Sequence, residues 1–377
     1  MQIEPFSWQG GWDSDAALKE AELLLYFASP DLIRTRDVAS LLSARYPAAR
    51  QIGCSTGGEI YCAEFIEGSL SGVALRLDRS EFTIAQSCIA ANKTAQDIGA
   101  ELAGELLREH LRLVFVLSDG LGVNGSELIR GFKSVLPDSV LLTGGLAGDG
   151  AAFESTYVGV DAAPVQGCVA ALGFYGRDFH CRSGCKGGWQ VFGPQRIITR
   201  SEGNILYELD DKPALDLYKQ YLGEEADTLP GSAMLYPLAI RPPGQAEQDV
   251  VRTIVGIDES QRSLTFAGDV PIGYSAQLMT SNYTHLADGA QESARQALAA
   301  DGNERTNPTE LAILISCIGR KLLMGQMVAD EVDAVREMMP GTVLTGFYSY
   351  GEIAPHGFTG SCELHNQTMT ITTMWEG

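Results

Sequence analysis

Three stretches of this 377-residue chain share one outline, and this repetition limits the folds that the chain can adopt. Each stretch begins with an apolar run of the kind that forms a buried strand, at residues 23–27, 113–117 and 311–315. A polar turn and an amphipathic helix follow, and a second strand then runs into glycine, at residues 51–60, 140–149 and 343–353. Such units place their loops and ligands at the carboxyl ends of the strands.

Segments with strand-like alternation lie between these units. Residues 73–77 and 82–85 are predicted to form a hairpin, as are residues 169–174 with a return strand after Gly187. Residues 368–374 predict a closing strand. The predicted fold class is therefore α/β, with repeated strand–helix–strand units and mixed sheets.

Composition excludes several classes of partner. The formal net charge of −21 argues against binding to nucleic acid and to anionic membrane surfaces. The amino terminus lacks the features of a signal peptide, and no apolar run approaches the ~20 residues that span a bilayer. The eight scattered cysteines are expected to be reduced thiols, so we predict a cytoplasmic protein.

The segment Gly53–Gly57 matches the G-x-S-x-G pattern of esterases, with Ser55 as the nucleophile. That elbow requires a helix directly after the serine, and residues 59–65 are too short and poorly patterned to form one. A serine hydrolase is therefore a weak alternative, and no other motif supports catalysis.

Polar and aromatic residues gather at the glycine-rich turns and beside two later apolar strands. An acidic residue follows each glycine cluster, and aromatic residues interleave with glycine in the third, as in the wall of a small-molecule pocket. Arg252 and Arg320, each next to one of these strands, either pair with carboxylates inside the protein or hold a ligand carboxylate. The candidate ligand-binding residues are Cys54, Ser55, Glu59, Asp119, Asp149, Arg252, Arg320, Tyr348, Tyr350 and Glu352.

Two of the five histidines, His356 and His365, flank the loop after the third glycine cluster. Their position makes them candidate ligands for a metal or a haem iron, although a histidine is more often a surface or hydrogen-bonded structural residue.

Taken in order, these motifs resemble the FIST family of sensory modules over nearly the whole chain. The resemblance rests on residues 53–60, 117–120, 144–149, 235–238, 251–252, 266–271, 316–321 and 346–353. It implies two lobes, with a FIST N-terminal domain at residues 20–211 and a FIST C-terminal domain at residues 212–377. It also implies a small-ligand sensor, not an enzyme, that passes its signal in trans to a histidine kinase or a cyclic-di-GMP enzyme.

The resemblance leaves the ligand open. Some family members are similar to nitric-oxide-sensing haem proteins, which would make His365 the first candidate for the iron ligand and His356 the second. The alternative is an amino-acid-type ligand without haem, with its carboxylate on Arg252 or Arg320 and its ammonium on Glu59 or Glu352. In either case a ligand between the two halves would bias their packing. A pure interaction scaffold would have no pocket there.

Overall fold

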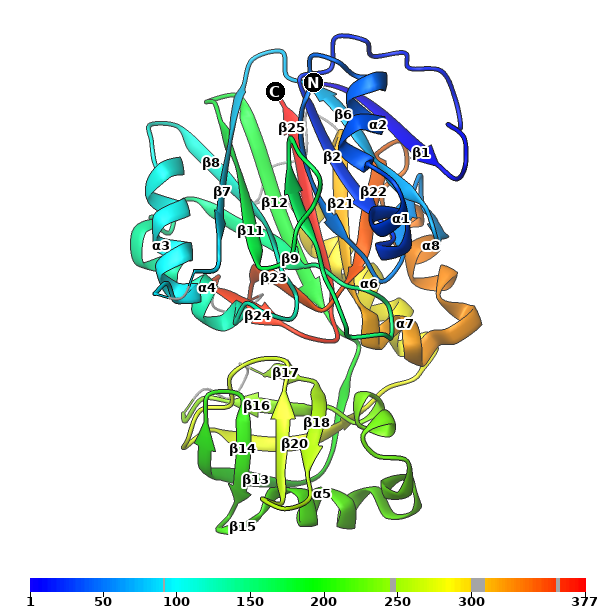
Figure 1. The fold of residues 1–377 in the computed structure, drawn as a ribbon. Helices are drawn as coiled ribbons and strands as arrows, with labels where there is room; N and C mark the ends of the chain where they lie inside the picture. Colours follow the sequence, from blue (N-terminus) through cyan, green and yellow to red (C-terminus); the bar gives the residue numbers. More distant parts are fainter. Residues whose placement is uncertain (91, 245–248, 300–308, 357–359) are drawn as a thin grey trace.

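The chain forms a body of three β-sheets with a smaller β-rich module beneath it (Figure 1). Both termini lie at the end of the body that is remote from the module (Figure 1). This computed structural model describes residues 1–90, 92–244, 249–299, 309–356 and 360–377.

Each predicted unit supplies one parallel pair of strands, and each pair forms the centre of one sheet. The pairs are β2 (Leu23–Ala28) with β3 (Arg50–Ser55), β8 (Leu111–Ser118) with β9 (Leu141–Leu146), and β21 (Leu311–Cys317) with β22 (Val343–Ser349). An antiparallel strand flanks each first strand: β6 (Leu70–Arg76), β11 (Cys168–Tyr175) or β25 (Met369–Glu376). The outer neighbours of these are β1 (Gln2–Trp8), β7 (Glu81–Cys88) and β12 (Phe179–Lys186). All three sheets therefore share one strand order.

The three units are joined by an exchange of short strands. After its glycine cluster, each unit sends a strand to pair with the second strand of another unit. The pairs are β4 (Glu59–Tyr61) with β22, β23 (Gly351–Pro355) with β9, and β10 (Val158–Val160) with β3. The first unit thus reaches the third, the third reaches the second and the second reaches the first, so the exchange closes a ring. Two further edge strands, β5 (Glu64–Ile66) and β24 (Cys362–His365), extend β4 and β23.

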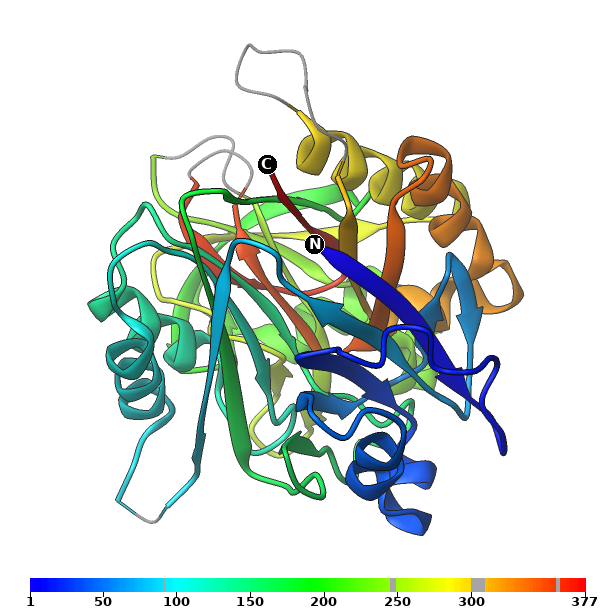
Figure 2. The same ribbon diagram turned by 90° about the horizontal axis from the view of Figure 1, so that it is seen from above.

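Helices cover the outside of the sheets in three groups, which are visible along the long axis in Figure 2. The groups are α1 (Pro30–Thr35) with α2 (Val38–Arg45), α3 (Ala95–Leu106) with α4 (Gly125–Val135), and α6 (Tyr283–Leu298) with α7 (Ile318–Met324), η3 (Gly325–Met327) and α8 (Ala329–Met338). Because side chains alternate along a strand, one face of each sheet turns inward and the other packs on helices. The inward residues meet in one central core, including Leu23, Leu25, Phe27, Leu113, Phe115, Leu117, Leu311, Ile313 and Ile315.

One glycine in each unit permits the close parallel pairing. A Cβ at Gly53, Gly144 or Gly346 would lie 2.3, 2.0 or 1.8 Å from a backbone oxygen of the neighbouring first strand. Any side chain there would push the two strands apart, so these glycines of the sequence repeat serve the sheets and not the ligand.

The module is one curled sheet with a helix packed against it. Its described strands are β13 (Gln190–Glu202), β14 (Ile205–Leu209), β15 (Lys212–Pro213), β16 (Leu238–Arg241), β17 (Val250–Arg252), β18 (Ile254–Asp258), β19 (Ser263–Phe266) and β20 (Ser275–Thr280). Its helices are α5 (Ala214–Leu222), η1 (Gly223–Thr228) and η2 (Gly231–Leu235). The two edge strands of this sheet, β17 and β18, are separated by only one residue in the chain. The sheet must therefore curl until its two edges lie close together. The predicted domain boundary at 211/212 lies within this module, at β15.

The fold class and the closing strand are confirmed, whereas both predicted hairpins are wrong. Strand β6 lies in the first sheet and β7 in the second, and β13, the strand after Gly187, belongs to the module and does not pair with β11. Alternation identifies strands but not their partners, and here the connections pass between sheets. The expectation of eight reduced thiols is also wrong, because Cys88 and Cys168 form a disulfide between β7 and β11.

Candidate functional site

The turn after β8 is built around the carboxylate of Asp119. This carboxylate is buried and accepts hydrogen bonds at 2.6–2.9 Å from three backbone N–H groups, those of Leu121, Gly122 and Gly167. Asp119 therefore fixes the path of the loop that leads into α4, and its oxygens are already occupied by the protein.

The loop after β9 is built in the same way around Asp149. Its carboxylate accepts hydrogen bonds of 2.8 Å from the N–H groups of Phe153, Glu154 and Ser155, and another from the Tyr350 hydroxyl. Burial alone would raise the pKa of Asp149, but these donors lower it. The ordered loop places the Phe153 ring on the Tyr350 ring, with centroids 4.6 Å apart and planes 14° apart. The second and third units thus build one aromatic wall together.

This wall faces a cavity of about 520 Å³ where the body meets the module, which we call the junction cavity. Its lining from the body is Gly120, Leu121, Gly122, Val123, Asn124, Gly125, Leu146, Phe153, Tyr350 and Leu364. Its lining from the module is Asn204, Val255, Phe266, Ala267 and Gly268. The volume lies in the range of small-molecule sites, and the apolar walls with a few polar groups have the composition of such sites.

The polar groups of the junction cavity lie around the start of α4. Asn124 caps this helix by accepting a hydrogen bond from the Glu127 N–H at 3.1 Å, and the first helical residue, Gly125, also lines the cavity. The amino end of an 11-residue helix carries a partial positive charge. The cavity is therefore suited to a ligand with an apolar, flat part and an anionic or hydrogen-accepting end.

The shape of the junction cavity depends on how the module is held. Asp269 of the module accepts hydrogen bonds from Asn124 at 3.3 Å and from Arg130 at 2.8 Å, both at the amino-terminal half of α4. On the other side, Asn366 of the body donates to the carbonyl of Ala267 and accepts from the N–H of Thr253, each at 3.4 Å. These four hydrogen bonds range from buried to exposed, and a shift of the module would alter both walls of the cavity.

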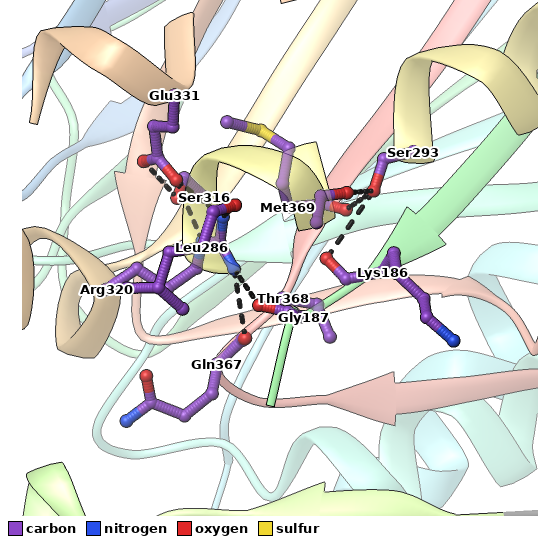
Figure 3. A network of polar contacts seen from close by, with 12 residues as sticks. Lys186, Gly187, Leu286, Ser293, Ser316, Arg320, Glu331, Gln367, Thr368 and Met369 are labelled. Atoms are coloured by element: carbon purple, nitrogen blue, oxygen red, sulfur yellow. Dashed lines mark hydrogen bonds and ion pairs between the residues drawn. The ribbon is translucent and has the colours of Figure 1, made fainter. Parts of the chain in front are cut away.

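Both connections between body and module meet at the buried guanidinium of Arg320 (Figure 3). Arg320 donates to the carbonyl of Gly187 at 2.5 Å, in the connection between β12 and β13 that enters the module, and to that of Leu286 at 2.8 Å, near the start of the helix that follows the module. Its charge is balanced by Glu331, whose carboxylate is 2.6 Å away and fully buried. Gly188 lies between the connections with a φ of +76°, and a Cβ there would be 1.9 Å from a carbonyl oxygen. Arg320 is thus placed as the anchor of the module's attachment, away from the junction cavity.

Two of the predicted acids, Glu59 and Glu352, occupy equivalent positions and share one set of contacts. The Glu59 carboxylate accepts hydrogen bonds from the hydroxyl of Thr56 and from the N–H and hydroxyl of Ser69, just before β6. The Glu352 carboxylate accepts the equivalent bonds from the hydroxyl of Ser349 and from the N–H and hydroxyl of Thr368, just before β25. Burial raises the pKa of both carboxyls to about 7. They fasten the exchanged strands β4 and β23 near their amino ends and do not line the junction cavity.

Three further predicted residues lie inside the body. Cys54 belongs to the central core, and the Tyr348 hydroxyl donates to Glu331 at 2.7 Å. Ser55 is fully buried, and its Oγ accepts a hydrogen bond from the Tyr157 N–H at 2.9 Å. Strand β4 follows Ser55 in place of a helix, as the sequence indicated, so the exposed elbow that an esterase needs is not formed.

His356 and His365 do lie together, beside a separate cavity of about 440 Å³. Their rings are stacked with centroids 6.1 Å apart, and burial lowers the pKa of His365 to about 3, which keeps the imidazole neutral as a metal ligand requires. Its Nε2 lies 3.0 Å from the Ala354 carbonyl, which leaves Nδ1 for a metal. The cavity wall is polar, with Lys186, Asp249 and Gln296 among its residues, so it fits a histidine-bound metal better than a porphyrin. No group of three or more metal-binding side chains occurs in the described part of the chain.

Of the predicted residues, Tyr350 lines the junction cavity, whereas Asp119 and Asp149 order the loops that carry its wall residues. Arg252 lines a second, smaller cavity. The sequence-based prediction missed Asn124, Asn204, Phe153 and the Phe266–Gly268 loop. The segment 266–271 was a signal that could have revealed part of this set, since it carries the family resemblance. Asn204 and Phe153 had no comparable signal.

Comparisons with known proteins agree with the motif assignment. The family model of the FIST N domain matches residues 22–212, and that of the FIST C domain matches residues 214–355. Uncharacterized protein Mb0898c of Mycobacterium bovis is 25% identical over 191 residues, which cover 47% of this chain and 48% of that protein. Uncharacterized protein MJ1623 of Methanocaldococcus jannaschii is 24% identical over 218 residues, covering 54% and 41%. The chain thus spans about half the length of the curated relatives it matches, or less.

Among solved structures, a crystal structure of chorismatase aligns over 99% of this chain and 98% of its own, with a TM-score of 0.37 and 9% identity. No helix in the described ranges is long and apolar enough to cross a membrane. FIST domains are small-ligand sensory domains of signalling proteins, and the two family models together cover most of this sequence. The chain belongs to the FIST family.

Proposed function

We propose that this chain senses a small molecule in the junction cavity and that the ligand acts by changing how the module packs on the body. The observation that carries the proposal is the cavity itself, about 520 Å³ in volume, with walls from both parts of the molecule. A ligand that contacts both walls binds one arrangement of the module better than another, which is the requirement for a ligand to shift a conformational equilibrium.

The walls favour an amino-acid-type or related ligand with a flat apolar part. The stacked Phe153 and Tyr350 rings and the Phe266 side chain offer apolar contacts, and the amino end of α4 suits a carboxylate. In contrast to the sequence-based expectation, this assignment uses neither Glu59 nor Arg320, since protein groups occupy both.

The signal would leave through the module. Besides the two connections at Arg320, it is held by a small set of hydrogen bonds, among them those of Asp269, Asn366, Arg252 and Gln367, so a ligand can move it as a unit. We propose that a histidine kinase or cyclic-di-GMP enzyme recognises the altered arrangement in trans.

A thermal-shift panel of amino acids and aromatic acids tests the proposal. Val255 lines the cavity from the module and is 41% exposed, so Val255→Trp should fill the cavity without disturbing the core. Val191 is 42% exposed on β13 and does not line the junction cavity, so Val191→Trp is the matched control. A ligand at 100 times its Kd stabilises the protein by about 2.7 kcal/mol. We expect such a shift for the wild type and Val191→Trp but not for Val255→Trp; equal shifts in all three would refute the assignment.

A haem-based nitric oxide sensor is the second candidate: the neutral His365 imidazole supports it as an iron ligand, whereas the polar wall of the cavity favours a metal over a porphyrin. The ultraviolet–visible spectrum with added haem, and then with nitric oxide on the reduced form, tests it. A sharp Soret band that moves with nitric oxide and disappears in His365→Ala would support haem; a spectrum of loosely associated haem in both proteins would remove this candidate.

A further inference from the structure

A second cavity, of about 280 Å³, lies between α4, β24 and the module, and we call it the Arg252 cavity. The body lines it through Arg130 and Lys133 of α4 and through Glu363 and Leu364 of β24. The residues of the module that matter below are Ile240, Arg252, Asp269 and Tyr274. About half of the wall is apolar, and unlike the lining of the junction cavity it includes charged side chains.

The central charged group is the guanidinium of Arg252, a residue only 7% exposed. It donates to three backbone carbonyls, those of Asp269 at 3.0 Å, Leu364 at 2.9 Å and Val251 at 3.2 Å. These bonds use Nε and Nη1, and Nη2 has no acceptor among the described residues. No carboxylate oxygen in the described ranges lies within 4.0 Å of this guanidinium. A buried charge without a counter-ion is costly, and buried charges in proteins are normally paired.

The surroundings of Arg252 are more positive than the protein as a whole. Three cations, Arg252, Arg130 and Lys133, line the cavity against two carboxylates, Asp269 and Glu363. In a chain with a formal net charge of −21, this excess of positive charge marks a place suited to an anion. Because two carboxylates are also present, a single negative charge fits better than a phosphate dianion.

We propose that the Arg252 cavity binds a small organic monocarboxylate, with its carboxylate on the Arg252 guanidinium and its apolar part against Ile240 and Tyr274. A guanidinium is the side chain best matched to a carboxylate, since its N–H groups donate in one plane. The volume of about 280 Å³ admits a short-chain or single-ring acid.

Such an anion would also act on the attachment of the module. Arg130 lines the same cavity and bonds to the Asp269 carboxylate at 2.8 Å, one of the few contacts that hold the module to α4. A bound carboxylate competes with Asp269 for Arg130. Occupation therefore loosens this contact, so the cavity is a second input to the same movement of the module. The binding itself does not depend on the sensory role proposed above.

Isothermal titration with butyrate and benzoate tests the proposal, with the neutral butyramide and inorganic phosphate as comparison probes. We expect heat from the carboxylates, with affinity that falls as salt is added, and none from butyramide. Absence of carboxylate binding up to about 10 mM, equal binding of butyramide, or binding of phosphate alone would each overturn the proposal.

Variants locate the site. Arg252→Met should weaken butyrate binding roughly tenfold or more, because it removes the main partner of the carboxylate. Lys133→Gln, at an exposed residue, should weaken it about threefold without affecting folding, whereas Lys19→Gln removes the same charge on the exposed segment before β2 and should have no effect. If Arg252→Met does not fold, the difference between Lys133→Gln and Lys19→Gln decides the question, and equal affinities refute the site. Val255→Trp should leave butyrate binding intact, which separates this result from a failure of the junction cavity.

Discussion

Substitution of Arg320 by methionine tests whether this residue anchors the module or serves a ligand. The change removes a fully buried charge and leaves Glu331, also fully buried, without its counter-ion. It also removes the guanidinium hydrogen bonds to the carbonyls of Gly187 and Leu286. Breaking a buried pair from one side costs about 3–5 kcal/mol, because an uncompensated charge stays in the interior. We therefore expect Arg320→Met to lower the free energy of unfolding by that amount.

Urea unfolding, followed by tryptophan fluorescence and by circular dichroism, measures this loss. Trp189 is a useful reporter, since its indole N–H donates to the Gln367 carbonyl at 2.9 Å beside the connection. Arg336→Met is the matched control, because Arg336 is 57% exposed and paired with Asp333 at 2.8 Å. Such a surface pair contributes about 0–1 kcal/mol.

A double-mutant cycle completes this test. Removing both charges in Arg320→Met/Glu331→Leu should cost less than the sum of the two single changes, by about 2–3 kcal/mol. If Arg320→Met costs no more than Arg336→Met, the guanidinium is not an anchor, and its assignment as a ligand group would return.

Three other perturbations have expected outcomes. The pKa values of Glu59 and Glu352 are raised from 4.5 to about 7 in the folded protein, so the stability they contribute is complete below about pH 4.5 and lost as the pH rises to 7. At 1.36 kcal/mol per pH unit, this contribution is about 3 kcal/mol per carboxyl. The urea midpoint of Glu352→Gln should therefore fall less steeply from pH 4.5 to 7 than that of the wild type; equal slopes in the two proteins would contradict the pKa shift. Reduction of the disulfide between Cys88 and Cys168, which closes a loop with a sequence separation of 80, should lower stability by about 4 kcal/mol. In denaturant, reduction should add two alkylatable thiols to the six free ones, and eight reactive thiols before reduction would show that the bond is absent. Tyr350→Phe should cost about 1 kcal/mol and speed hydrogen exchange in the loop beneath the ring, and unchanged exchange would show that its hydroxyl does not order that loop.

The units of the fold could be predicted from sequence because their signals are local. Apolar runs, turn residues and helical periodicity identify β8, α4 and β9 without knowledge of the rest of the chain. The exchange of β4, β10 and β23 between units could not be predicted, because pairing depends on where the units meet and not on the strands' own residues. The two wrong hairpin predictions have the same cause.

The site was only partly predictable for a related reason. Acidic residues at strand ends are used for binding in many proteins, but Glu59 and Glu352 are enclosed by hydroxyl and N–H donors of their own unit. Only the folded structure shows that these oxygens are occupied. Conversely, Asn204 and Phe153 become wall residues because distant segments meet at the junction cavity.

Hydrogen–deuterium exchange with and without the best ligand of the panel tests whether the ligand bridges body and module. One ligand should protect residues 120–125 of the body and residues 266–268 of the module together, since both line the junction cavity. Protection of one wall alone, or protection confined to the peptides around His356 and His365, would contradict this bridging.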